Sequence, residues 1–298
     1  MNWDFKQWSA LAAAADCGSF EQAAVQLNIT ASAVSKRIRD LEETAGALLI
    51  TRARPCRPTA QGQQLLRYWR QVVSLQQALA HELQQRPPVL SLAANHDSLD
   101  TWLLPVLAEA AADGGLLLDI QVEDQDHTRA LLAEGRVMAA VSSEAETLRG
   151  CEVHALGGLR YRLMAAPAFA ARYFSDGLTP AALRRAPLLV FNRKDDLQAD
   201  FLRRHLQADA AMCPTHYVPS SHAFLQAVRM GLGYGMLFEQ QLQSEQIKAG
   251  ELLDLCPQYF IDVPLFWHCW QAQPPKLQSL RKAVQRSAAV HLTAVQSG

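Results

Sequence analysis

The sequence predicts a multidomain α/β protein: a small helical unit at the N-terminus, one long helix, and a larger domain of strands and helices. Three observations support this. Short amphipathic helices fill the start of the chain, a proline-free helical stretch follows, and from residue 89 apolar strands alternate with helical periods. A chain of 298 residues with 49% hydrophobic content suits two to three domains. We place the small helical unit at residues 1–58, the long helix at 59–85, a hinge at 86–88 and the larger domain at 89–298.

The first unit is predicted to contain a helix-turn-helix. An opening helix from about Phe5 to Asp16 presents apolar residues at helical spacing. A second helix spans Ser19 to Leu27, where Ser19 and Gln22 form a capping-box pattern. Asn28 and Ile29 form the turn, and Thr30 is suited to cap the third helix.

The third helix has an apolar inner stripe and a basic outer face, which is how a recognition helix is built. Such a helix enters the major groove of DNA with its N-terminal residues nearest the bases, while cations neutralise phosphates. Residues 30–70 carry eight basic and three acidic side chains, although the whole chain has a net charge of −1. An ordinary solvated face is the alternative. The candidate DNA-binding residues here are Thr30, Ser32, Ser35, Lys36, Arg37 and Arg39.

A two-stranded wing is predicted after this motif. The segments 48–52 and 56–58 are extended pieces on either side of Ala53-Arg54-Pro55. Arg52 and Arg54 would then lie near phosphates or the minor groove, where basic side chains add affinity with little sequence information. The alternative is that they only solvate the hairpin tip.

The stretch from Thr59 to Gln85 is predicted to be one long helix with an apolar seam. The seam residues repeat at alternating spacings of four and three, as in a coiled coil. The stripe could pack on its own winged unit, but it outruns so small a domain, which favours self-association. A dimer would place two recognition helices on one duplex and predicts a pseudo-palindromic site. The predicted dimerisation residues are Leu65, Trp69, Val72, Gln76, Leu79 and Leu83.

Arg86-Pro87-Pro88 ends this helix, because proline lacks the amide hydrogen and clashes with the preceding turn. We expect a hinge there. Alternating elements then predict parallel sheets covered by helices. The predicted strands are 89–94, 116–123, 137–141, 161–165, 188–191, 216–219 and 265–270, and the predicted helices are 99–112, 125–134, 167–174, 180–185, 197–205, 221–230 and one from about 275. They suggest two lobes, one at about 89–160 and 267–298 and the other at about 161–266.

Two such lobes enclose a cleft, and ligands of open α/β sheets bind at the carboxyl ends of strands. Ser98 and Ser221 begin helices, where backbone amides favour a carboxylate. Asp97, Glu123 and Asp124 could hold an ammonium or guanidinium group. The set suits a zwitterion with a cationic tail, although each residue could be only a helix cap. The effector-binding candidates are Asn95, Asp97, Ser98, Glu123, Asp124, Ser142, Ser143, Ser220 and Ser221.

Catalytic, metal and redox functions have little support in the sequence. The six cysteines are scattered without a Cys-x-x-Cys pair, as expected of a reduced cytosolic chain, and neither Cys213 with His216 nor His268 with Cys269 has the spacing of a closed zinc site. Gly231-x-Gly233-x-Gly235 lacks the dinucleotide pattern, and Gly231 reads as a helix C-cap. We expect no enzyme, no cofactor and no metal.

The chain also has no candidate membrane span and no secretory signal pattern at its start. A cytoplasmic location is therefore the expectation.

These residues together resemble the LysR-type transcriptional regulators. The resemblance is carried by Phe20-Glu21-x-Ala23-Ala24, by Thr30-x-Ser32-Ala33-Val34-Ser35-x-Arg37-Ile38-x-x-Leu41-Glu42 and by Pro58-Thr59-Ala60-x-Gly62. The run Asp97-Ser98-Leu99-x-Thr101-Trp102-Leu103-Leu104-Pro105 is more specific and resembles the arginine- and lysine-responsive members, including the lysine-export regulators. Ala31 and Lys36 stand where many relatives have Gln, so the operator sequence cannot be carried over.

The resemblance implies a periplasmic-binding-protein-like effector domain that binds L-lysine or L-arginine, and control of basic amino-acid export or metabolism. The implied partners are double-stranded promoter DNA and a second copy of the chain, with a tetramer and contact with RNA polymerase left open. Two alternatives remain: a LysR-type regulator of another small effector, and an architectural DNA-binding protein without an effector.

Overall fold

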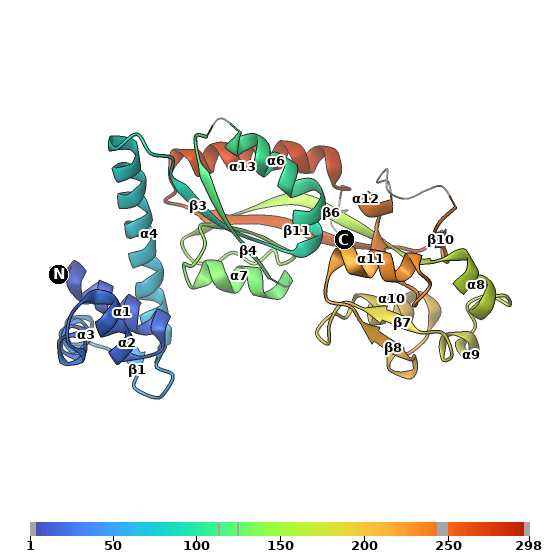
Figure 1. Ribbon diagram of the computed structural model, residues 1–298, viewed down its shortest axis with the longest axis horizontal. Coiled ribbons are helices and arrows are strands. Elements are labelled where there is room, and N and C mark those ends of the chain that lie inside the picture. The colour runs from blue at the N-terminus through green and yellow to red at the C-terminus, as the bar shows by residue number, and fades with distance from the viewer. Residues whose placement is uncertain (1–3, 113, 124, 243–249, 295–298) are drawn as a thin grey trace.

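The computed structural model describes residues 4–112, 114–123, 125–242 and 250–294. A small helical domain, one long helix and a large α/β domain follow one another along the molecule, as the sequence predicts (Figure 1). The elements before the large domain are α1 (Phe5–Cys17), α2 (Phe20–Leu27), α3 (Ala31–Ala45), β1 (Ile50–Thr51), β2 (Arg57–Pro58) and α4 (Ala60–Leu83).

Local capping defines the helix-turn-helix. The Ser19 hydroxyl accepts a hydrogen bond from the amide of Gln22 at 3.3 Å, and the Thr30 hydroxyl accepts one from the amide of Ala33 at 3.2 Å. Asn28 adopts the left-handed conformation with φ of 53°, which a short polar side chain tolerates. This residue ends α2 and redirects the chain toward α3. Behind α3 lies a small core of fully buried side chains, among them Leu11, Val34, Ile38 and Leu41.

The wing is the antiparallel pair β1 and β2. A buried carboxylate holds it against α3: Glu42 accepts hydrogen bonds from the amides of Leu49 at 2.9 Å and Ile50 at 3.4 Å. α4 then begins directly against the wing, with Gly62 so close that an added Cβ would lie 1.8 Å from the carbonyl oxygen of Leu49. Only glycine allows this approach.

Replacing Gly62 with Ala is therefore expected to destabilise the N-terminal domain by about 1 to 3 kcal/mol, because the backbone must move to relieve the overlap. Thermal unfolding of the variant measures the loss. Gly115→Ala is the matched control, since its Cβ would meet only the flexible end of Lys276 at 3.1 Å. Equal melting temperatures for the two variants would contradict the assigned packing.

The large domain is built on one curled sheet in the strand order β10-β6-β11-β5-β3-β4, with β9 paired to β6. β3 is parallel to β4 and β5, whereas β11 is antiparallel to β5 and β6. A separate parallel pair, β7 and β8, completes the strands of the described residues. The strands are β3 (Val89–Ala94), β4 (Leu117–Val122), β5 (Ala139–Ser142), β6 (Cys151–Ala165), β7 (Leu188–Val190), β8 (Thr215–Tyr217), β9 (Gly235–Phe238), β10 (Leu253–Asp254) and β11 (Ile261–Trp270).

Helices cover the sheet in each of two lobes. In lobe I, α6 and α13 cover one face of the sheet and α7 covers the other (Figure 1). The helical elements are α5 (His96–Ser98), η1 (Leu99–Leu103), α6 (Leu104–Ala111), α7 (Gln125–Ala133) and α13 (Pro275–His291) in lobe I, and α8 (Pro167–Tyr173), α9 (Pro180–Leu183), α10 (Leu197–Leu206), η2 (Ala210–Met212), α11 (Ser221–Arg229) and α12 (Glu239–Leu242) in lobe II.

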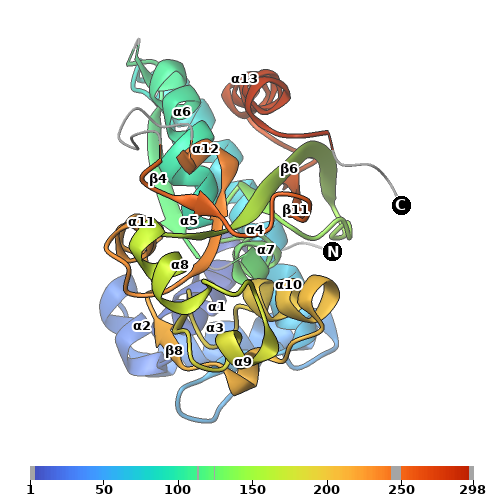
Figure 2. The same ribbon diagram turned by 90° about the vertical axis from the view of Figure 1, so that its right-hand side faces the viewer.

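The two lobes share continuous strands. β6 and β11 pair along their length and run from one lobe into the other (Figure 1). Figure 2 shows the molecule from the lobe II end, with these strands foreshortened. The lobe boundary that we placed between residues 160 and 161 falls inside β6, which begins ten residues before the predicted strand at 161–165. Gly157 and Gly158 obscured this strand in the sequence. At Gly157 the backbone has φ of 129° and an added Cβ would lie 2.8 Å from the Cβ of Leu292.

One predicted helix has a different form. In place of a regular helix over 99–112, the chain forms α5, then a wide π-type turn at Leu99–Leu103, then α6. Pro105 lies at the start of α6 and has no amide hydrogen to donate, so the preceding carbonyl groups cannot keep a regular ladder. No helix among the described residues is both long and apolar enough to span a membrane.

Candidate functional site

The proposed DNA-reading residues lie together on one outer surface. Ser32, Lys36 and Arg39 are exposed on α3, and Ser35 and Arg37 are half-buried beside them. Thr30 is exposed at the N-cap of α3, and its hydroxyl also shares a hydrogen bond with Ser32 at 2.9 Å. Within the described residues no ion pair involves the cations of this helix, so they are free to meet phosphates.

The two wing arginines differ in their surroundings. Arg54 is 87% exposed but pairs with Glu21 at the start of α2, at 3.0 Å. Hydrogen bonding from Ser19 and the nearby Arg54 guanidinium lower the pKa of that carboxyl. Arg52 is also exposed, and the described residues contain no ion pair to it. Arg52 is therefore the wing cation that is better placed to contact a phosphate.

Replacing Arg52 with Ala is expected to weaken DNA binding to a similar degree on all sequences and to reduce the slope of log K against log salt by about 1, because one counterion release is lost. Fluorescence anisotropy at several salt concentrations measures the slope. For Arg54→Ala we expect a smaller change, since Arg54 must first leave Glu21. An unchanged slope for Arg52→Ala would remove this residue from the interface.

The apolar seam of α4 is divided between two environments. Its first part packs within the N-terminal domain. Leu65 joins the N-terminal core, and the Trp69 ring centroid lies 5.4 Å from that of Phe5 and 5.9 Å from that of Trp8. Beyond that point the stripe is exposed, and Leu79 and Leu83 have exposed fractions of 56% and 76%. The exposed large apolar side chains of α4 are Tyr68, Val72, Leu75, Leu79 and Leu83. Tyr68 and Leu75 therefore extend the predicted set, and Gln76 is a polar, exposed member of it.

A cavity of about 540 Å³ lies between the lobes, within the size range of small-molecule sites. Its walls include α5, the crossover strands β6 and β11, β9, the loop after β7, α10 and α11. The charged side chains that line it are the acidic Asp97, Glu123, Asp195, Asp196, Asp200 and Asp262 and the basic Lys194 and Arg204. Carboxylates therefore predominate, which favours a cationic ligand.

Asp97 is the centre of this site. Its carboxylate accepts hydrogen bonds from Ser221 on α11 and from Tyr161 on β6, so one side chain of lobe I joins lobe II and the crossover strand. Burial raises the pKa of Asp97, and the nearby Asp100 and Asp195 raise it further, while the two hydrogen bonds oppose the shift. Within the described residues Asp97 has no cationic partner. A bound cation would supply the missing charge.

The other effector-binding candidates fall into two groups. Asn95, Glu123 and Ser221 line the cavity with Asp97. Asn95 also caps α5 by accepting from the amide of Ser98 at 3.1 Å, and its buried Nδ2 has no hydrogen-bond partner among the described residues.

The remaining candidates do not line the cavity. Ser98 is fully buried, Ser142 accepts from the amide of Glu144 at 3.2 Å, Ser143 is half-buried, and Ser220 caps α11 through the amide of Ala223 at 3.4 Å. Among these four, Ser220 matches the helix-cap alternative. Asp124 lies outside the described residues.

Several lining residues were not among the sequence candidates. Asp195 and Asp196 follow β7, so the rule that selected residues after each strand applies to them as well. Asp195 accepts hydrogen bonds from the amides of Phe191 at 3.2 Å and Leu197 at 3.0 Å, and burial raises its pKa. Tyr161 gave no signal in the sequence, because its place in the site depends on how β6 crosses between the lobes.

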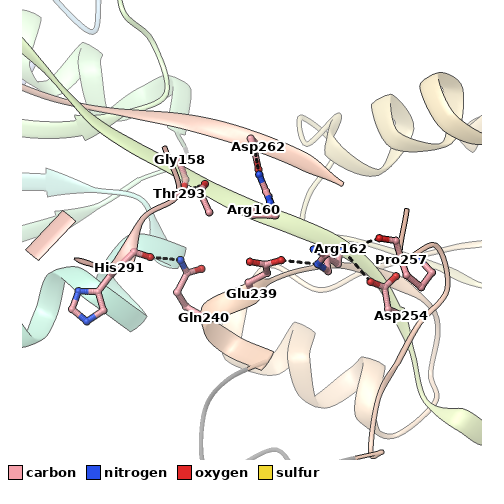
Figure 3. Close-up of polar contacts among 10 residues, drawn as sticks. All are labelled: Gly158, Arg160, Arg162, Glu239, Gln240, Asp254, Pro257, Asp262, His291 and Thr293. Atoms are coloured by element: carbon pink, nitrogen blue, oxygen red, sulfur yellow. Dashed lines mark hydrogen bonds and ion pairs between the residues drawn. The ribbon is translucent and has the colours of Figure 1, made fainter. Parts of the chain in front are cut away.

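Ion pairs brace the crossover strands close to the cavity (Figure 3). Arg160 on β6 forms two 2.8 Å hydrogen bonds to Asp262 on β11, and its guanidinium lies 3.8 Å from the ring centroid of Phe260. Arg162 reaches Glu239 at 2.6 Å and the carbonyl of Pro257 at 3.1 Å. These pairs fix the strand that presents Tyr161.

The described residues contain one cluster with metal-ligand chemistry, formed by Glu152, His154 and Cys269. An arginine already faces it: Arg281 Nη1 lies 2.7 Å from Glu152 Oε2 and 2.8 Å from His154 Nε2. Burial also raises the pKa of the Cys269 thiol, which disfavours the thiolate that metals bind. Neither Cys213 with His216 nor His268 with Cys269 forms such a cluster among the residues described.

Comparison with known proteins covers nearly the whole chain. Residues 5–63 match the bacterial regulatory helix-turn-helix protein, lysR family, and residues 83–289 match the LysR substrate binding domain. The regulator LysG of Mycobacterium tuberculosis is 40% identical over 289 residues, which are 96% of this chain and 93% of LysG.

Two similar solved structures also cover the chain. ArgP from Mycobacterium tuberculosis has a TM-score of 0.87 at 39% identity, over 99% of this chain and all of that one. Full-length LysG from Corynebacterium glutamicum with bound effector Arg has a TM-score of 0.83 at 36% identity, over 98% and 100% of the two chains.

Proposed function

The chain belongs to the LysR family of transcriptional regulators, and from this premise we propose that its cleft binds L-lysine or L-arginine and thereby controls transcription. The genes under its control would serve the export or metabolism of basic amino acids. The observation that carries the proposal is the carboxylate-rich cavity centred on Asp97, which has no cationic partner among the described residues. The arginine bound to the similar Corynebacterium glutamicum LysG supports the same class of ligand.

The chemistry of the lining suits a basic amino acid better than an anion. Such a ligand carries two cationic groups and one carboxylate. The carboxylates of Asp97 and of Asp195 are both available to cations, since neither forms an ion pair within the described residues. Asp262 and Asp200 are already paired with Arg160 and with Arg203 and Arg204.

Calorimetric titration with L-lysine, L-arginine and the neutral analogue L-norleucine tests this proposal. Norleucine has the carbon chain of lysine without its side-chain charge, so we expect heat from the two basic amino acids only. Equal heat from norleucine would favour a LysR-type regulator of another effector. No heat from any of the three would favour a DNA-binding protein that acts without one of these ligands.

Effector binding is also expected to depend on pH. Because burial raises the pKa of Asp97, its carboxyl takes up a proton at a higher pH than usual, whereas a bound cation favours the ionised form. Binding below that raised pKa must therefore release a proton, and the affinity for lysine should rise with pH through the pKa and level off above it. Calorimetry in buffers of different ionisation enthalpy measures the proton release. An affinity for lysine that falls as pH rises through this range would contradict the role of Asp97.

The DNA-binding unit is proposed to act as a homodimer through the exposed stripe of α4. Two recognition helices would then read a pseudo-palindromic promoter site. Effector binding would change the arrangement of the lobes, and with it the spacing of the two recognition helices. Assembly into a tetramer and contact with RNA polymerase are further proposals that the family membership permits.

A further inference from the structure

We propose that Arg70 on α4 is the positioning residue that transmits the state of the effector domain to the DNA-binding domain of the same protomer. Its guanidinium donates one hydrogen bond to the carbonyl of Glu134 at the end of α7 and forms an ion pair with Asp16 on α1. One side chain of the linker helix therefore joins all three parts of the chain. The inference rests on the proposed effector response.

The contact between α4 and the effector domain is close and specific in its geometry. Gly135 follows Glu134 with φ of 73°, and an added Cβ there would lie 3.1 Å from the Cα of Arg67 and 3.3 Å from the Cδ of Arg70. Further along α4, the buried Ser74 hydroxyl lies 3.6 Å from the sulfur of Met138. The turn after α7 thus packs directly on the linker helix.

The Arg70 side chain is only 19% exposed, which distinguishes it from an ordinary surface ion pair. Exposed ion pairs contribute little, whereas a guanidinium with fixed partners on two domains sets their relative orientation. The second partner, Asp16, lies at the end of α1, the helix that packs against the recognition helix α3. A displacement of Glu134 would therefore be transmitted through Arg70 and Asp16 to the recognition helix α3.

α7 links this contact to the effector cavity. Glu123, which lines the cavity, lies just before the N-terminus of α7, and Glu134 follows its C-terminus. Nine helical residues span about 14 Å as a rigid rod. Arg129 in its middle pairs with Glu144, and with Glu146 at 2.7 Å, in the segment after β5. A movement at the mouth of the cavity can therefore reach Arg70 through one helix.

The test compares Arg70→Gln with Arg136→Gln, a control that lies at the same turn and faces Glu134 at 3.9 Å on the surface. For each full-length protein, calorimetry gives the affinity for lysine, and anisotropy gives the affinity for promoter DNA with and without lysine. In the wild type the effector should change the DNA affinity by roughly 5- to 150-fold. In Arg70→Gln we expect this ratio to fall toward one while lysine binds within about twofold of wild type. Arg136→Gln should keep the wild-type ratio.

Asp16→Asn provides a second test at an exposed position, where loss of folding is not expected. It should reduce the ratio in the same way, and the double variant should be no worse than either single one, because both remove the same link. A wild-type ratio in both Arg70→Gln and Asp16→Asn would overturn the inference. Absence of lysine binding to the wild type would instead overturn the proposed function, so the two failures are distinguishable.

Discussion

Replacing Asp97 with Asn is expected to weaken the binding of both L-lysine and L-arginine by roughly 30-fold or more. Asn keeps the shape of the side chain and can still face Tyr161 and Ser221, but it removes the charge that a cation would neutralise. The loss of one partner from a buried charge pair typically costs about 2 to 5 kcal/mol, and about 1.4 kcal/mol corresponds to a factor of ten. Calorimetric titration of the variant measures the change.

Asp200→Asn is the matched control for this experiment. Asp200 also lines the cavity, but its carboxylate already pairs with Arg203 and with Arg204 at 3.1 Å. We expect the control to keep an affinity close to that of the wild type. Unchanged lysine binding by Asp97→Asn, or an equal loss in both variants, would show that Asp97 is not the centre of recognition.

The double replacement of Leu79 and Leu83 with Asp is expected to produce monomers that lose specific DNA binding. Both side chains are exposed on the single chain, and charges there would oppose burial between two α4 helices. Because linking two readers raises affinity by about 100- to 10,000-fold, a monomer should lose a comparable factor on the full site. Analytical ultracentrifugation reports the mass, and anisotropy with a promoter fragment reports the affinity.

Gln77→Asp adds a charge at an exposed position of α4 away from this stripe and serves as the control. It should remain a dimer with wild-type affinity. If the Leu79 and Leu83 double variant still sediments as a dimer, the interface lies elsewhere. A monomer with wild-type affinity for promoter DNA would contradict the proposal that two recognition helices bind one site together.

Local signals in the sequence were sufficient to predict the helices and the turn of the DNA-binding unit. Capping at Ser19 and Thr30 and the left-handed turn at Asn28 are decided by neighbours within a few residues, so the pattern and the structure agree there. The confirmed α/β fold of the large domain follows in the same way from alternating strands and helices. The predicted boundaries of elements were wrong where a single residue changed the backbone, as Pro105 does at the start of α6.

The site itself was only partly predictable. Asp97 and Ser221 follow from their positions after strands, but Tyr161 enters through the crossover of β6, a long-range feature that no local pattern records. Arg70 is a comparable case. In the sequence it is one basic residue on a long helix, and only the folding of α7 against α4 brings Glu134 to it.

A crystal structure of the protein with L-lysine or L-arginine tests the proposed effector site most directly. We expect the amino acid in the cavity between the lobes, with one of its cationic groups against the carboxylate of Asp97 and with Ser221 in contact with the ligand. A ligand bound elsewhere, with Asp97 still held only by Tyr161 and Ser221, would contradict it.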